Sequence, residues 1–163
     1  MDDLVIFDFN SKSDLSNWNV VNDGVMGGKS NSQFYLNDNG QGTFEGKISL
    51  ENNGGFCSVK YNGNPVSLTK NKFFILRLKG DDKQYQFRVK SDRNDPHSYI
   101  FPFKTSGEWQ TITIPIQQMY PAFRGQKLEI PNFNGANLDE VAFLIGNKET
   151  ESFKLLIQSI KVQ

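Results

Sequence analysis

The strongest constraint on the fold is a set of short segments that alternate apolar and polar residues and are separated by turn residues. Clusters of Gly, Asn, Asp and Pro interrupt the chain about every 8–12 residues, as in many all-β proteins. In residues 43–50, for example, Phe44, Ile48 and Leu50 share one face of a strand. We count about ten or eleven such strands and no long helix, which predicts an antiparallel β-sandwich or barrel.

The order of the segments gives further expectations. Residues 72–79 are apolar on both faces, which is typical of a central strand. Residues 115–119 are predicted to hold a short helical turn, and residues 120–137, which contain several Pro and Gly, are predicted to be a loop. Because there is no linker and no internal repeat, residues 1–163 are expected to form one domain.

Residues 23–30, Asp-Gly-Val-Met-Gly-Gly-Lys-Ser, contain a Gly-Lys-Ser triplet like that of phosphate-binding loops. Such a loop requires a glycine where this chain has Asp23, and it is followed by a helix. Here a strand is predicted to follow, so we do not interpret the stretch as a nucleotide site. We expect instead a tight turn in which the glycines adopt positive φ.

Several blocks of sequence together match the signature of one protein family. They are Trp18, residues 22–30, 44–46, 52–59 and 78–81, Tyr85, Phe103, Trp109, residues 114–115, 121–125 and 145–146, and Phe153, Leu155 and Ile160. On these residues the chain resembles the NADH:ubiquinone oxidoreductase complex I intermediate-associated protein 30 family over essentially its whole length. The resemblance implies an all-β, jelly-roll sandwich of the galactose-binding domain-like type. For mitochondrial members it also implies a non-enzymatic assembly factor of respiratory complex I.

The charge and cysteine content of the chain limit the classes of partner and the cellular location that we expect. Lys and Arg together number 18 and so do Asp and Glu, so we do not expect a nucleic-acid-binding surface. No apolar run approaches the roughly 20 residues of a membrane span, and the acidic start at Asp2 and Asp3 is unlike a signal peptide. Cys57 is the only cysteine, which excludes an intrachain disulfide and favours a cytoplasmic location.

Groups that could carry out catalysis are sparse. His97, the only histidine, follows Pro96 in a polar turn and is expected to be solvated. Cys57 stands among apolar neighbours, so we expect a buried and unreactive thiol. Asp81 and Asp82 are adjacent but lack the spacing of metal ligands. We therefore expect no enzymatic activity, no catalytic residue, no metal and no cofactor.

The glycine-rich stretch supplies the first candidate binding residues, which are Asp23, Met26, Gly27, Gly28 and Ser30. In one interpretation Asp23 caps backbone N–H groups of its own loop and is structural. In the other, Met26 is exposed at the loop tip and is an adaptable apolar contact for a partner.

Two tryptophans and one arginine are further candidates. Exposed on the surface, Trp18 or Trp109 would be a sugar-stacking platform or a protein-binding hot spot, whereas a buried tryptophan is an ordinary core residue. Arg124 either anchors its loop through an ion pair or contacts a ligand.

Arg77, Gln86 and Arg88 fall on outward positions of strands that we predict to be neighbours. In that arrangement they form a polar ladder on the concave face of a sheet. The alternative is ordinary pairing with acidic residues on adjacent strands, worth a few tenths of a kcal/mol each, roughly.

Two functions fit these observations. The first is a non-enzymatic, chaperone-like module that binds another protein, such as a respiratory-complex subunit or an assembly intermediate, as the resemblance implies. The alternative is a carbohydrate-binding module, because galactose-binding-like sandwiches commonly bind glycans through aromatic rings and polar ladders. A fold by itself does not decide between them.

Overall fold

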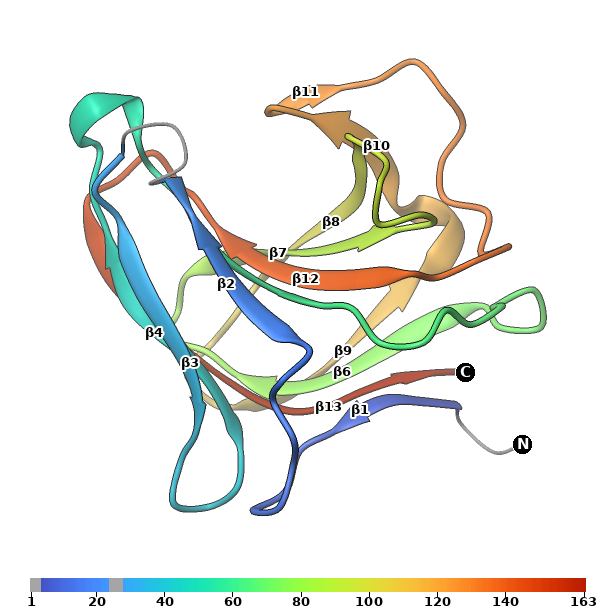
Figure 1. Ribbon diagram of the computed structural model, residues 1–163, viewed down its shortest axis with the longest axis horizontal. Helices are drawn as coiled ribbons and strands as arrows, with labels where there is room; N and C mark the ends of the chain where they lie inside the picture. Colours follow the sequence, from blue (N-terminus) through green and yellow to red (C-terminus); the bar gives the residue numbers. More distant parts are fainter. Residues whose placement is uncertain (1–3, 24–27) are drawn as a thin grey trace.

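The computed structural model describes residues 4–23 and 28–163 and shows an all-β protein (Figure 1). These residues form thirteen strands and two single turns of 3₁₀ helix, without an α-helix. The strands are β1 Leu4–Asp8, β2 Trp18–Asn22, β3 Asn31–Leu36, β4 Gly42–Ile48, β5 Cys57–Tyr61, β6 Phe73–Lys79, β7 Gln84–Lys90, β8 Ser98–Lys104, β9 Trp109–Pro115, β10 Tyr120–Phe123, β11 Gln126–Lys127, β12 Glu140–Ile145 and β13 Glu151–Val162; the 3₁₀ turns are η2 Glu51–Asn53 and η3 Ile116–Gln118.

The strands form two packed sheets, as predicted. Sheet A has the order β3-β4-β13-β6-β9, with β1 also paired to β13, and sheet B has the order β11-β10-β8-β7-β12-β5-β2. Every strand pairing within them is antiparallel. Strand β6 lies between β13 and β9, which confirms its central position, and η3 confirms the predicted helical turn.

One region differs from the expectation. Residues 120–137 are not entirely a loop, because β10 and β11 form a hairpin that adds an edge to sheet B. The two residues between the strands, Arg124 and Gly125, have φ of 50° and 79°. Positive φ at both turn positions matches the right-handed twist of the strands that a two-residue hairpin joins. The turn therefore allows β10 and β11 to pair, although the Pro and Gly residues of this region predicted a loop.

Aromatic rings join the two sheets. The ring of Phe74 in sheet A lies 5.0 Å from that of Phe87 in sheet B, and Phe87 lies 5.4 Å from Phe143 on the adjacent strand. Tyr85 of sheet B contacts Phe153 of sheet A at 6.4 Å. Because these rings are fully or almost fully buried, they supply much of the apolar area that stabilises the sandwich.

Trp18 belongs to a second aromatic cluster at the edge of the core. Its ring stacks on Phe34 at 4.8 Å and on Tyr61 at 5.0 Å, and Phe7 meets it edge-on at 5.4 Å. Only 7% of Trp18 is exposed. Of the two interpretations of this residue, the structure therefore supports the core residue and not an exposed platform.

Cys57 is buried at the start of β5, with no exposed surface. Burial raises the pKa of its thiol to about 11, and the nearby Asp23 carboxylate adds to the rise. The thiol is therefore protonated at physiological pH and shielded from solvent.

No helix in the described parts of the chain has the length and apolar character that crossing a membrane requires.

We expect Cys57 in the folded protein to react with a thiol-specific disulfide reagent only as fast as the chain unfolds, because both burial and the raised pKa suppress the thiolate. The measurement is the rate of colour release in buffer and in denaturing urea. Reaction in buffer at the rate of a free thiol would contradict this assignment.

Candidate functional site

A groove of about 960 Å³ lies on the face of sheet B that points away from sheet A. Its floor is formed by β2, β5, β12, β7, β8 and β10. In Figure 1, β12 and β7 cross between the β10–β11 hairpin at upper right and the teal segment around η2 at upper left. Residues from both segments line the groove, so they form its two walls. The volume is in the range of sites that hold small ligands or peptide segments.

The centre of the floor is a small residue between two long cations. Ala142 of β12 lies opposite Lys60 of β5 and opposite Arg88 of β7. Two residues further along each strand, Glu140 of β12 lies opposite Lys90 of β7. Side chains two residues apart on a strand share a face, so all five point into the groove. The short side chain of Ala142 leaves the floor hollow between the two cations.

Leu144 continues the floor toward the η2 wall, opposite Ser58 and Gln86. The side-chain oxygen of Gln86 is buried, and none of the described residues donates a hydrogen bond to it. A buried acceptor without a donor is costly, so this atom is a place where a ligand N–H or O–H would be bound.

Burial dominates the electrostatics of the floor. It lowers the pKa of Arg88, against the opposing effect of Glu140 and Tyr120. Among the described residues, no carboxylate lies within ion-pairing distance of Arg88. Glu140 is instead 3.9 Å from the Lys60 Nζ and accepts a 3.1 Å hydrogen bond from the Asn62 side chain.

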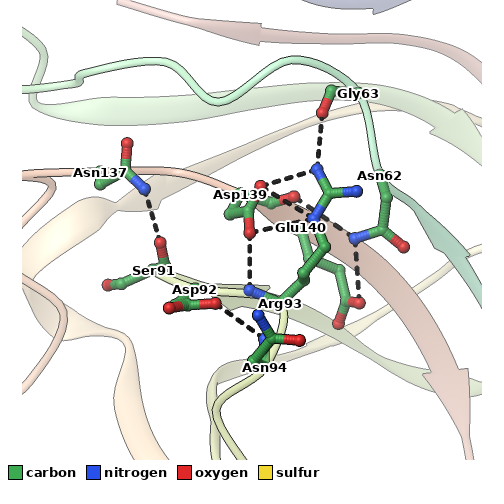
Figure 2. Close-up of polar contacts among 9 residues, drawn as sticks. All are labelled: Asn62, Gly63, Ser91, Asp92, Arg93, Asn94, Asn137, Asp139 and Glu140. Atoms are coloured by element: carbon green, nitrogen blue, oxygen red, sulfur yellow. Dashed lines mark hydrogen bonds and ion pairs between the residues drawn. The ribbon is translucent and has the colours of Figure 1, made fainter.

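Figure 2 shows the polar network that positions Glu140. The adjacent Asp139 accepts hydrogen bonds from the Arg93 backbone N–H at 2.6 Å and from the Arg93 guanidinium at 2.7 and 3.1 Å. These bonds hold the pKa of Asp139 below its usual range. Arg93 also donates to the Gly63 carbonyl at 2.9 Å. The network joins the ends of β5, β7 and β12 and so sets the position of Glu140 in the floor.

The wall around η2 depends on the buried carboxylate of Asp23. It accepts hydrogen bonds from the Ser30 N–H at 3.0 Å, the Ser30 hydroxyl at 2.5 Å and the Gly55 N–H at 2.6 Å. Asp23 is only 1% exposed and Ser30 is 7% exposed. These hydrogen bonds agree with the interpretation in which Asp23 caps backbone N–H groups of its own loop. The carboxylate also binds the N–H of Gly55, which is far away in sequence.

The glycine-rich stretch has a steric requirement at Gly28. Space requires a glycine there, because a Cβ on Gly28 would lie 2.4 Å from the Asp23 carboxyl carbon. Met26 and Gly27 lie outside the described residues.

The opposite wall presents cations held against aromatic rings. The Arg124 guanidinium lies 5.2 Å from the centre of the Phe123 ring, and the Lys127 Nζ lies 5.6 Å from that of Tyr120. Of the two interpretations of Arg124, anchoring by an ion pair is not seen among the described residues, where the Phe123 ring is its partner.

The predicted ladder of Arg77, Gln86 and Arg88 is only partly correct. Gln86 and Arg88 are together in the groove floor, but Arg77 is on β6 of sheet A. There its guanidinium lies 5.9 Å from the centre of the Trp109 ring and donates a 3.3 Å hydrogen bond to Thr111. Consecutive strands of the chain, β6 and β7, belong to different sheets, which a pattern of alternation does not reveal.

Of the candidate binding residues, the structure thus places Arg88 and Arg124 in the groove and Asp23, Gly28 and Ser30 together behind one wall. The sequence analysis missed the other charged residues of the groove. Lys90 had a visible signal, because it shares a strand face with Gln86 and Arg88. Lys60 and Glu140 had none, since their neighbours come from distant segments.

Comparison with known proteins identifies the family. Residues 7–157 match the sequence model of the family described as Complex I intermediate-associated protein 30. The chain belongs to this family. A mitochondrial Complex I intermediate-associated protein 30 from Drosophila melanogaster is 22% identical over 144 residues, which are 75% of this chain. The chain spans 49% of the length of that relative.

Two further similarities extend over nearly all of the chain. An uncharacterized protein of Schizosaccharomyces pombe is 25% identical over 97% of this chain and 83% of its own length. The family 11 carbohydrate-binding module of a cellulosomal cellulase from Clostridium thermocellum has a TM-score of 0.70 at 15% identity, covering 99% of this chain and 94% of that one. At this identity the similarity establishes a shared fold, in agreement with the predicted galactose-binding-like sandwich.

Substitution of Asp23 tests the carboxylate behind the η2 wall. Burial alone would raise the pKa of Asp23, but the hydrogen bonds from Ser30, Gly55 and Phe56 outweigh it and lower the pKa. We expect Asp23→Asn to lower the free energy of unfolding at neutral pH by about 2–3 kcal/mol, because an amide cannot accept all of these bonds. The measurement is urea unfolding, with the exposed Asp38→Asn as control.

The same comparison has a defined pH dependence. A lowered folded-state pKa means that the carboxylate stabilises fully above the unfolded value of 3.8 and that this stabilisation is lost as the pH falls through the folded value. The difference between wild type and Asp23→Asn should therefore stay constant from neutral pH to about pH 5 and shrink only as the pH falls below about 4. A difference that does not change with pH would contradict the assignment.

A second substitution tests the space at Gly28. We expect Gly28→Val to lower the free energy of unfolding by about 1–3 kcal/mol, since the new side chain must displace the Asp23 carboxylate. Lys29→Val at the neighbouring exposed position is the control. Equal thermal melting temperatures for wild type and Gly28→Val would remove the steric argument.

Proposed function

We propose that this chain is a non-enzymatic, chaperone-like module that binds another protein during assembly of a larger complex, and that the groove on sheet B is its docking surface. The observation that carries the proposal is the groove itself, which combines buried polar groups with exposed apolar side chains. Membership of the family supports a partner related to respiratory complex I, such as a subunit or an assembly intermediate.

The composition of the groove supports binding over catalysis. Among the described residues of its lining Glu140 is the only carboxylate, and it is engaged by Asn62 and Lys60. A pair of facing carboxylates, as hydrolysis of glycosidic bonds requires, is therefore missing from the described lining. The only histidine, His97, is outside the lining and packs against the ring of Tyr99 at 5.3 Å.

Carbohydrate binding is the second candidate, and the similarity in fold to a carbohydrate-binding module favours it. The aromatic residues argue for protein instead. Neither Trp18 nor Trp109 lines the groove. Phe56, Tyr120 and Phe123 do line it, and of these Tyr120 and Phe123 each have a cation close to the ring. A sugar that stacks on these two rings would have to displace Lys127 or Arg124.

The compartment that we propose is the cytoplasm, because the single cysteine fits a reducing environment. The Drosophila relative is a mitochondrial protein, so the partners recovered from cells also test this location.

The test is affinity capture from cells of the same organism, followed by mass spectrometry, with a variant whose groove is filled. We expect Ala142→Phe to fold normally and to lose the partner protein that wild type recovers, because the ring occupies the hollow between Lys60 and Arg88. Thr113→Phe, exposed on the outer face of sheet A, is the matched control and should retain the partner.

Two results would contradict the proposal. One is recovery of the same partners by Ala142→Phe and wild type. The other is binding of wild type to a glycan array that Ala142→Phe abolishes, which would assign the groove to carbohydrate.

A further inference from the structure

The groove has a strong excess of positive charge although the chain as a whole is neutral. In the part of the chain that the structure describes, its lining contains one acidic residue, Glu140, and six basic ones: Lys60, Arg88, Lys90, Arg124, Lys127 and Lys148. The whole chain has 18 basic and 18 acidic residues. One-third of the basic side chains thus line a single concave surface, which creates a field that attracts anions.

The cations of the floor are close enough to affect one another. Burial lowers the pKa of Lys90, Lys60 and Arg88 lower it further, and Glu140 and Asp95 oppose this effect. The Lys90 Nζ donates a 2.6 Å hydrogen bond to the backbone carbonyl of Asp95, and no ion pair of Lys90 is seen among the described residues. A ligand carboxylate between Arg88 and Lys90 would relieve this repulsion and gain charge-assisted hydrogen bonds.

Apolar side chains stand on both walls of the same groove. Leu50, on the η2 side, is 44% exposed, and Phe123, on the β10 side, is 39% exposed. They are two of the few large apolar residues that the described surface exposes to this extent. An acidic polysaccharide offers carboxylates but has no aliphatic side chains to cover them. A polypeptide offers both.

The floor also provides a group that matches a peptide backbone. The buried Gln86 oxygen has no donor among the described residues, and a backbone N–H of a bound chain would supply one. From β2 to β10 the groove crosses six strands, so its five intervals of about 4.8 Å span about 24 Å. That distance corresponds to about seven residues of extended chain.

We propose that the groove binds an extended polypeptide segment in which acidic side chains alternate with apolar ones, the acidic side chains on the cations of the floor and walls and the apolar ones against Leu50 and Phe123. This inference rests on the proposed function, that the groove docks a protein, and adds the chemistry of the docked segment. Charge complementarity makes such a segment associate faster at low ionic strength.

The experiment measures fluorescence anisotropy of a labelled synthetic peptide in which Glu alternates with Val. Matched peptides carry Gln or Lys in place of every Glu. We expect the Glu peptide to bind, its affinity to fall with added salt, and the Gln and Lys peptides to bind at least about tenfold more weakly, because charge-assisted bonds to the floor are lost.

Variants of the protein locate the interaction. Arg88→Gln should raise the Kd of the Glu peptide by about tenfold or more. Arg77→Gln, which removes an arginine from the outer face of sheet A, should leave it unchanged. Arg124→Gln and Lys127→Gln change only the wall formed by the β10–β11 hairpin, and each should weaken binding several-fold. The test therefore remains valid even if Arg88→Gln does not fold.

The outcomes separate this inference from the function on which it rests. Equal binding of the Glu and Gln peptides, or no binding of the Glu peptide, overturns the proposal that the bound segment is acidic. The capture experiment then still decides whether the groove docks a protein. Binding of labelled polygalacturonate without binding of the Glu peptide assigns the charge to an acidic glycan and overturns both. Unchanged affinity in Arg88→Gln, Arg124→Gln and Lys127→Gln places the peptide elsewhere and also overturns the inference.

Discussion

Packing of aromatic rings between the two sheets is the interaction on which the remaining structure depends. Phe74, Phe87 and Phe143 meet in the core, and they come from three strands of two different sheets. Because side chains alternate along a strand, a ring that faces the core commits its neighbours to the opposite face. In β7 and β12 those neighbours are Arg88 and Ala142, so the core that stabilises the sandwich also defines the floor of the groove.

Two acidic residues, Asp23 and Asp139, make structural contacts outside the lining of the groove. Asp23 accepts hydrogen bonds behind the η2 wall, and Asp139 pairs with Arg93 at the ends of β5, β7 and β12. Both carboxylates join segments beside the groove that are far apart in sequence. As a result, a chain without net charge presents a positively charged concave surface. The total charge of a sequence is therefore a poor guide to the partner that one face selects.

The fold was predictable from the sequence, whereas the site was predictable only in part. Alternation along single strands placed Gln86 and Arg88 on one face, and the structure confirms it. The assignment of Arg77 to the same face was wrong, because β6 and β7 follow one another in the chain but lie in different sheets. Residues 120–127 read as a loop because they contain Pro and Gly, yet their turn closes a wall of the groove.

The sequence by itself determined the family, the all-β class and the buried character of Cys57, because these follow from local pattern and from blocks of residues that are contiguous in the chain. Only the tertiary structure decided which charges meet. Lys60, Glu140 and Arg88 become neighbours through pairing of β5 with β12 and of β12 with β7, across separations of about 50 to 80 residues. Strand order is set by packing of the whole sandwich, so the chemistry of a surface that crosses strands is not written in any one segment.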